Sequence, residues 1–138
     1  MDLISLTYTS LARLDLQESD IDAIQRSARE LNALDGITGL LIFNGTHFLQ
    51  IVEGSENAID ELVERLRSDA RHSALEVRDR RTIGERQFPD WSMELVRVST
   101  RYSAAKDTVA GHLPPALPEG VRERVMQMTE SISGTVSL

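Results

Sequence analysis

The stretch from Gly36 to Gly54 (GITGLLIFNGTHFLQIVEG) constrains the fold more than any other part of the chain. Two runs of β-favouring residues flank Asn44-Gly45, and an Asn-Gly pair in that setting is the strongest short-range signal for a β-hairpin. The pair predicts a two-residue turn with both central residues at positive φ. Both faces of the two strands are apolar, so we expect both faces to be covered.

Gln50 interrupts the apolar pattern of the second strand. Its primary amide falls on the same face as Phe48 and Val52. Burying such an amide without hydrogen-bond partners costs about 1–3 kcal/mol. The groups that satisfy Gln50 are therefore the first place to look for function.

The composition limits the classes of function. The 138 residues and an apolar content of 41% suit one domain with a real core. A net charge of −7 argues against binding nucleic acid or an anionic membrane. The absence of cysteine excludes disulfides and thiolate nucleophiles, and three widely spaced histidines make a weak case for a metal site. Neither a signal peptide nor a membrane-spanning run is recognisable, so we expect a cytoplasmic protein.

The order of predicted elements indicates an α+β fold. Alternation predicts a strand over residues 2–10. The 3.6-residue spacing predicts a helix from Ser19, as N-cap with Asp22, to about Leu34, with an apolar stripe of Ile21, Ile24, Ala28 and Leu31 and with Asn32 at its edge. After the hairpin, a second helix begins at Ser55. Two further strands follow, over residues 74–83 and 91–98. The order β-α-β-β-α-β-β predicts a ferredoxin-like, mixed five-stranded sheet with two helices on one face.

The last part of the chain differs in character, which predicts a division into residues 1–100 and a helical extension over residues 101–138. A segment over 102–112 and an amphipathic segment over 119–132 are separated by the proline-rich LPPALPEG. We expect two short helices that cover the other face of the sheet or bind a partner.

Three residues are polar on faces that should be buried: Tyr8, Asn32 and Gln50. In the predicted fold the first and third strands can lie side by side, so Tyr8 and Gln50 can touch. A slot between the two helices would then be floored by Gln50, with Arg65 and Asp69 contributed by the second helix. Its apolar walls would be Ile24, Ala28, Phe48 and Leu66. A flat, polar-edged heterocycle fits such a slot. The alternatives are a core network that satisfies itself and, for Arg65 and Asp69, an ordinary surface pair at i and i+4.

The sequence resembles the BLUF domain, the blue-light sensor that uses FAD, over roughly residues 1–100. The resemblance is carried by LTYTS around Tyr8, by NALDGITG from Asn32 and by FNGTHFLQIVEG around Gln50. It is completed by Arg65, Asp69, Arg71-His72 and FPDWSM. The whole length is similar to the short, stand-alone members.

The resemblance implies a role for each photochemical residue. Tyr8 would give an electron and then a proton to the photoexcited flavin. Gln50 would lie between that tyrosine and the N5/C4-carbonyl edge, and its amide would rotate or tautomerise after light, shifting flavin absorption to the red. Trp91 and Met93 match the last-strand pair whose exchange of position near Gln50 would relay the signal.

The resemblance also implies the cofactor contacts. Asn32 would hold the pyrimidine edge of the ring, Arg65 and Asp69 would contact the flavin and its ribityl chain, and His72 would lie near the same ligand. Leu31 and Ala28 depart from polar residues found in several members. Because no phosphate-cradling glycine loop is visible, we expect a loosely held adenosine diphosphate tail, with FMN or riboflavin as possible substitutes for FAD.

The interpretation is a blue-light photoreceptor without catalytic turnover. Its signal would pass through the last strand and the C-terminal helices to a separate protein, and the apolar stripe of those helices suggests a homo-oligomer. One rival is an acylphosphatase-like hydrolase, which would need a glycine-rich amide cradle that does not follow Tyr8. The other is a ligand-free ferredoxin-like interaction module. Arg78, Arg80 and Arg81 are interpreted as a solvated sheet face rather than a nucleic-acid site.

Overall fold

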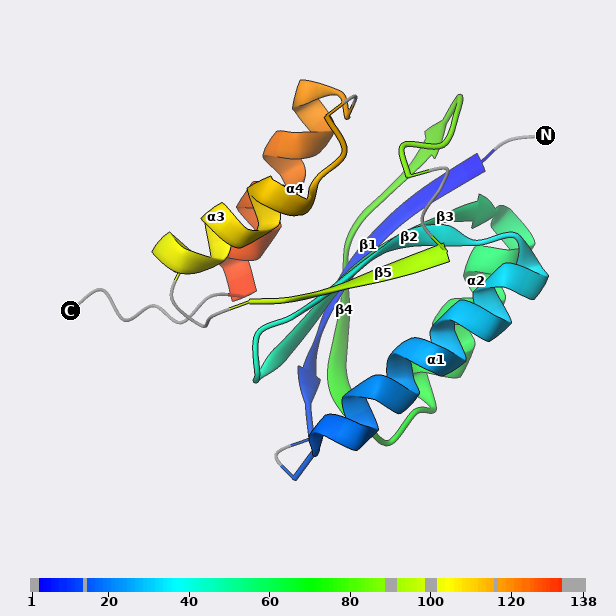
Figure 1. Cartoon of the computed structure of the whole chain (residues 1–138). Helices are drawn as coiled ribbons and strands as arrows, with labels where there is room; N and C mark the ends of the chain where they lie inside the picture. The colour runs from blue at the N-terminus through cyan, green and yellow to red at the C-terminus, as the bar shows by residue number, and fades with distance from the viewer. Residues whose placement is uncertain (1–2, 14, 89–91, 99–101, 116, 133–138) are drawn as a thin grey trace.

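The computed structural model describes residues 3–13, 15–88, 92–98, 102–115 and 117–132 of the chain. Five strands and four helices alternate in the predicted order (Figure 1). They are β1 (Leu3–Ala12), α1 (Glu18–Asp35), β2 (Thr38–Phe43), β3 (His47–Ser55), α2 (Glu56–Arg67), β4 (His72–Ile83), β5 (Ser92–Arg97), α3 (Tyr102–His112) and α4 (Glu119–Ile132).

The strands form one mixed sheet in the order β4-β1-β3-β2-β5. β1 lies antiparallel between β3 and β4, β2 pairs antiparallel with β3, and β5 is parallel to β2. The predicted ferredoxin-like α+β fold is therefore confirmed, with β5 added at the β2 edge.

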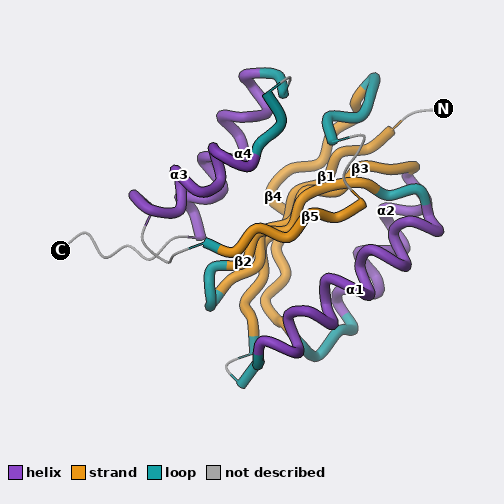
Figure 2. Tube along the Cα trace, in the orientation of Figure 1, coloured by secondary structure: helices purple, strands orange, loops and turns teal. Residues whose placement is uncertain are grey.

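Both faces of the sheet are covered, as the two apolar faces of the hairpin predict. Helices α1 and α2 lie on one face and α3 and α4 on the other (Figures 1 and 2). On β3, Phe48 and Val52 belong to the core under α1 and α2, whereas Leu49 and Ile51 belong to the core under α3 and α4. Alternation along a single strand thus supplies both cores.

The hairpin forms where Asn44-Gly45 predicts it, but its turn differs from the predicted type. The last strand pair is Phe43 with Phe48, and only Gly45, at +95°, is recorded with a positive φ between them. Asn44 instead uses its side chain: its Oδ1 accepts hydrogen bonds from the backbone N–H groups of Thr46 and His47. An Asn side chain that closes a turn in this way makes the second positive φ unnecessary.

The Asn44 side chain also ties the hairpin to the last helix. Its Nδ2 donates to the carbonyl oxygen of Ile132 at 2.7 Å, in a buried contact. Because the final carbonyls of a helix lack partners within the helix, this amide satisfies one of them. The turn and the C-terminus of α4 are therefore held together.

The start and the buried face of α1 also differ from the prediction. The N-cap is Gln17, whose backbone N–H donates to the Asp20 carboxylate, rather than Ser19 with Asp22. Leu31 is 44% exposed, whereas the neighbouring Asn32 is fully buried. Both residues border the cavity described below, where Asn32 is enclosed and Leu31 is partly open to solvent. By contrast, Ser55 caps α2 as predicted, accepting a hydrogen bond from the Ala58 N–H.

The pairing of β2 with β5 is irregular at Met93. Gly39 pairs with Ser92 and Leu40 with Glu94, so Met93 is an extra residue, a β-bulge, with a φ of +128°. A non-glycine residue held at such a φ stores about 1–3 kcal/mol of strain. Its neighbour Gly39, at φ +156°, has no room for a side chain, because an added Cβ would lie 1.9 Å from the Ile51 carbonyl oxygen.

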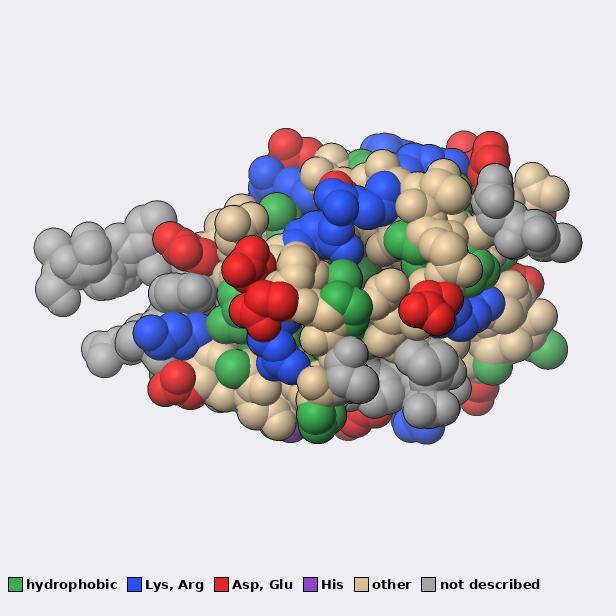
Figure 3. Space-filling view, turned by 90° about the horizontal axis from the view of Figure 1, so that it is seen from above, with side chains coloured by type: hydrophobic (Ala, Val, Ile, Leu, Met, Phe, Trp, Pro, Cys, Tyr) green, Lys and Arg blue, Asp and Glu red, His purple; other side chains and the backbone are tan. Residues whose placement is uncertain are grey.

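Charges are mixed on the surface. Figure 3 shows basic and acidic side chains interspersed on the face seen from above. The arginines of β4 have acidic neighbours: Arg78 lies by Glu76, Arg80 by Asp60 and Arg81 by Asp79. Within the described residues, no helix is long and apolar enough to span a membrane.

Two glycine substitutions test the irregular pairing. Gly45→Ala meets open space and adds only the strain of a positive φ, so we expect a loss of about 1–2 kcal/mol in the free energy of unfolding. Gly39→Ala adds a clash with β3, which we expect to cost about 1–3 kcal/mol more. Urea denaturation of both variants gives the two numbers, and equal losses would show that the backbones of β2 and β3 are not in close contact at Gly39.

Candidate functional site

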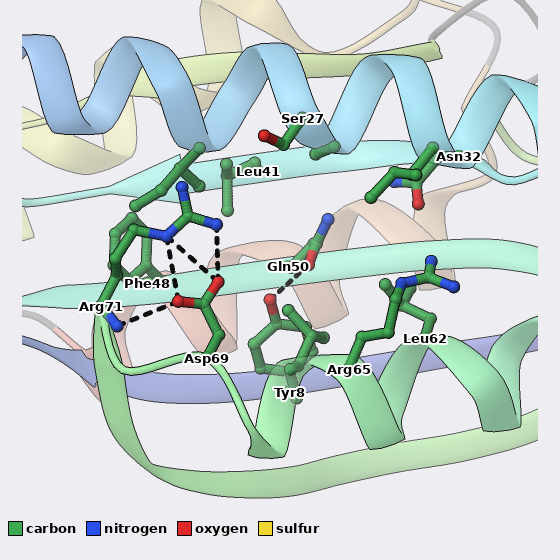
Figure 4. Close-up of a pocket in the computed structure, with 14 residues that line it drawn as sticks. Tyr8, Ser27, Asn32, Leu41, Phe48, Gln50, Leu62, Arg65, Asp69 and Arg71 are labelled. Carbon is green, nitrogen blue, oxygen red and sulfur yellow. Dashed lines mark hydrogen bonds and ion pairs between the residues drawn. The ribbon is translucent and has the colours of Figure 1, made fainter.

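A cavity of about 350 Å³ lies between α1 and α2 above the central strands. Gln50 and Tyr8 line its floor, and the two helices form its walls (Figure 4). Its lining contains Tyr8, Ile24, Ser27, Ala28, Leu31, Asn32, Leu41, Phe48, Gln50, Leu62, Arg65, Leu66, Asp69 and Arg71. A space of this size, mostly apolar with a few converging polar groups, is typical of a small-molecule site.

A chain of hydrogen bonds crosses the floor of the cavity. Tyr8 and Gln50 are directly opposite one another on β1 and β3, and the Tyr8 hydroxyl donates to Gln50 Oε1 (Figure 4). The other end of the amide, Nε2, donates to the sulfur of Met93 at 3.0 Å. All three side chains are at least 97% buried. The amide of Gln50 therefore has one defined orientation, fixed by a donor on one side and a soft acceptor on the other.

The surroundings keep the Tyr8 phenol protonated. Burial, and to a smaller extent the negative charge of Asp69, raises the pKa of Tyr8 well above its ordinary value. Because the phenolic proton is retained throughout the physiological range, Tyr8 acts as the donor toward Gln50 in the resting protein.

Two polar side chains at the cavity have atoms that are buried without a partner. Among the described residues, Asn32 has neither Oδ1 nor Nδ2 hydrogen-bonded, and Arg65 Nη2 is also unpaired. Figure 4 shows the Asn32 amide directed from α1 into the space above Gln50. Each unpaired buried group costs about 1–3 kcal/mol, so this arrangement is typical of a site that a polar ligand completes.

The charged residues of α2 and the following loop are not paired as in the alternative of an i, i+4 surface pair. Arg65 is 3.4 Å from Asp35 at the end of α1, and Asp69 is bound by Arg71. Arg71 donates to both Asp69 oxygens, with the shortest contact 2.7 Å, which raises the pKa of Arg71. Asp69 lies beyond the end of α2, so it turns toward Arg71 rather than back to the helix.

The structure brings most of the predicted site residues to this one cavity. Tyr8, Ile24, Ala28, Asn32, Phe48, Gln50, Arg65, Leu66 and Asp69 line it, and Met93 contacts Gln50. His72 begins β4, but its side chain is outside the described residues, and so is Trp91. The described residues contain no cluster of His, Asp and Glu that could hold a metal ion.

Sequence reasoning missed some of the lining residues. Ser27, Leu41, Leu62 and Arg71 also face the cavity. Ser27 lies three residues after Ile24 and Leu62 four before Leu66, so helical spacing could have pointed to them. Leu41 follows from alternation on β2, because it pairs with Gln50. The position of Arg71 depends on its pairing with Asp69, for which the sequence has no periodic signal.

Comparison with known families agrees with this geometry. The BLUF profile, described as sensors of blue-light using FAD, matches residues 3–94. The chain belongs to the BLUF family. FAD is the cofactor of that family, and the buried amide of Asn32 and the free Nη2 of Arg65 fit a heterocycle with carbonyl and ring-nitrogen edges.

Curated BLUF relatives are much longer than this chain. The beta subunit of the photoactivated adenylate cyclase of Euglena gracilis is 35% identical over 92 residues, which are 66% of this chain and 11% of the relative. The blue light- and temperature-regulated antirepressor BluF of Escherichia coli is 34% identical over 70 residues, 51% of this chain and 17% of the relative. This chain therefore matches only 11% and 17% of the length of these two relatives.

Solved BLUF structures have the same fold as this chain. The dark-state structure of BlrB is 39% identical, covers 94% of this chain and 97% of its own, and has a TM-score of 0.74. The BlrP1 BLUF structure is 27% identical, covers 100% and 94%, and has a TM-score of 0.81. Klebsiella pneumoniae BlrP1 has also been solved with FMN and cyclic diGMP, matching 94% of this chain and 34% of its own with a TM-score of 0.73 and 28% identity.

A substitution at Asn32 tests whether the cavity is built for a polar ligand. Asn32→Leu keeps the volume but removes the two unpaired polar atoms, so the ligand-free protein should gain about 1–3 kcal/mol in the free energy of unfolding. The same variant should bind FAD at least about tenfold more weakly. Thermal unfolding and flavin titration measure the two effects, with the exposed Asn57→Leu as the matched control. Unchanged FAD affinity would remove Asn32 from the site.

Proposed function

We propose that this BLUF protein is a blue-light photoreceptor in which FAD binds non-covalently in the cavity between α1 and α2. The observation that carries the proposal is the buried hydrogen-bond chain from Tyr8 through Gln50 to Met93, which lies under the unpaired amide of Asn32. When bound, the flavin supplies the absorption of blue light and, once excited, an acceptor for an electron.

The cavity supports a division of roles among its polar residues. Asn32 and Arg65 offer hydrogen bonds to the ring, and their desolvation cost is recovered only when a ligand is present. Asp69, held by Arg71 at the cavity, would contact the ribityl chain. The described lining contains no glycine-rich loop for phosphates, which supports binding of FMN or riboflavin as substitutes for FAD.

Tyr8 and Gln50 are the photochemical pair of the proposal. Tyr8 would give an electron to the excited flavin and then pass its phenolic proton toward the same group through the Gln50 amide, which would leave Gln50 Oε1 without its donor. A glutamine amide has a donor and an acceptor of nearly equal size, so reversing it changes the hydrogen bonds while keeping the shape. A reversed Gln50 no longer offers its N–H groups to the sulfur of Met93.

Met93 is the residue through which a reversal of the Gln50 amide would reach the rest of the protein. It sits at the strained bulge of β5, and β5 carries Val96 into the core under α3 and α4. A strained residue that loses its one polar partner is suited to change conformation. We therefore place the output on β5 and the C-terminal helices, with residues 1–100 as the sensor part and residues 101–138 as the extension that reads it.

The output is proposed to be an interaction rather than a reaction. In this proposal the helices α3 and α4 carry the signal to a separate protein or to a second copy of the chain. The rival, a ligand-free interaction module, would leave the Asn32 amide and Arg65 Nη2 permanently unpaired at a cavity of about 350 Å³. That cost favours the photoreceptor.

The direct test is the absorption spectrum of the purified protein with and without Gln50→Leu. The wild-type protein should be yellow and its flavin spectrum should shift to the red, reversibly, under blue light. Gln50→Leu should bind flavin but lose the shift, because leucine has no amide to reverse, while the exposed Gln127→Leu on α4 should behave as wild type. A protein that stays colourless after reconstitution would contradict the proposal, and an intact shift in Gln50→Leu would exclude Gln50.

A second substitution tests the donor. Tyr8→Phe keeps the ring in the core but removes the hydroxyl that donates to Gln50. We expect flavin to bind and the red-shifted state to be absent, with a loss of about 1 kcal/mol in stability from the missing hydrogen bond. Difference spectra under continuous blue light and thermal unfolding give both values; a shift of wild-type size would exclude Tyr8 as the donor.

A further inference from the structure

Glu53 is a fully buried carboxylate that the proposed photochemistry does not use. It lies on β3 three residues after Gln50 and is 0% exposed. Both of its oxygens accept backbone hydrogen bonds from the loop between β4 and β5: Oε2 from the Gln87 N–H at 2.7 Å and Oε1 from the Phe88 N–H at 2.8 Å. A buried charge is tolerated only with such partners, so its hydrogen bonds to this loop are a defined structural feature.

The loop that Glu53 binds connects two strands that lie far apart in the sheet. β4 and β5 are the two edges of the sheet, four strand spacings apart, or about 19 Å. Residues 84–91 connect these strands in sequence, and a chain of that length could span roughly 30 Å if extended. Because this reach exceeds the separation of the two edges, chain length alone does not determine where β5 begins, and the contacts of the described residues 84–88 become important.

Arg86 adds a second attachment for the same loop. Its guanidinium donates to Thr38 Oγ1 at 2.9 Å, to the Glu53 carbonyl oxygen at 3.0 Å and to the Gly36 carbonyl oxygen at 2.7 Å. The loop is thus bound to the start of β2 and the end of α1 as well as to β3. Phe88, at the end of this segment, is 1% exposed and packs in the core under α3 and α4.

These contacts close a ring that includes the hydrogen bond between Gln50 and Met93. From Gln50 the ring follows β3 to Glu53, crosses to Phe88 by hydrogen bonds, follows the chain to Met93, and returns to Gln50 Nε2 through the sulfur. The positions of both partners are therefore set relative to β3: Gln50 is part of this strand, and Met93 follows the loop that Glu53 binds. The bulge at Met93 is strained, so the backbone alone would not keep its sulfur in this place.

We propose that Glu53, with Arg86, is the positioning element that holds Met93 against Gln50 and so sets how readily the two separate. Glu53 contacts neither the cavity nor Gln50, so it acts through the loop and β5. Its influence on the light response rests on the proposed function, whereas its hold on Met93 does not.

The first experiment needs neither light nor flavin. The chain has four methionines, so methyl-¹³C labelling gives a short spectrum in which Met93→Leu identifies the Met93 signal. Glu53→Gln keeps the shape but places an amide N–H₂ against a backbone N–H, which should displace or broaden the Met93 signal in flavin-free protein. Val125→Ala changes a residue of α4 in the core under α3 and α4, and this variant should leave the Met93 signal in place.

The second experiment measures the response of the flavin-loaded protein. At equal flavin occupancy, Glu53→Gln should change the rate of return from the red-shifted to the dark spectrum by about two- to thirtyfold, and Val125→Ala by less than about twofold. Arg86→Gln should also displace or broaden the Met93 signal and change the return rate in the same direction as Glu53→Gln. If Glu53→Gln does not fold, the results for Arg86→Gln test the proposal.

The outcomes separate the two proposals. A Met93 signal that is unchanged in both Glu53→Gln and Arg86→Gln overturns the positioning role. A displaced signal with an unchanged return rate overturns the control of the light response by Glu53. If the wild-type protein shows no light-induced shift but the Met93 signal moves in the variants, the photoreceptor proposal fails while the hold of Glu53 on Met93 stands.

Discussion

The rest of the site depends on one buried amide with two different neighbours. Gln50 accepts a hydrogen bond from the Tyr8 hydroxyl and donates one to the sulfur of Met93. The first partner is on the adjacent strand β1 and is firmly held, whereas the second is a weak acceptor on a strained bulge at the edge of the sheet. This asymmetry gives a change at Gln50 a preferred direction, toward β5.

The sheet lies between the cavity and the C-terminal helices that we propose as the output, and it contacts both. The cavity lies wholly on the face covered by α1 and α2, and the C-terminal helices lie on the other (Figure 1). Yet β2, β3 and β5 contribute side chains to both cores, so a shift of one of these strands would change the packing on both faces of the sheet. Because packed interiors are dense, such a shift favours discrete alternative packings over gradual deformation.

Much of this arrangement could be predicted because it follows local pattern. The Asn-Gly hairpin, the Ser55 cap and the spacing on both helices determine the fold class, and placing Gln50 opposite Tyr8 needs only the strand order. The features that could not be predicted depend on contacts between distant segments. Asn32 is buried beside the partly exposed Leu31 where both border a cavity. The spacing of apolar residues in the sequence does not predict a cavity. The role of Glu53 was also hidden, because a glutamate at the end of a strand, just before Gly54, has the pattern of a surface residue until the crossing loop is placed beside it.

The contact between Asn44 and Ile132 has a consequence for how such modules can be joined to other domains. It fixes the last turn of α4 to the turn that precedes the strand carrying Gln50. A polypeptide fused downstream of α4 would thus emerge from an anchored point only a few residues along β3 from the photochemical centre. The stiffness and phase of such a linker, more than its composition, would then determine whether a small movement at that anchor reaches the attached domain.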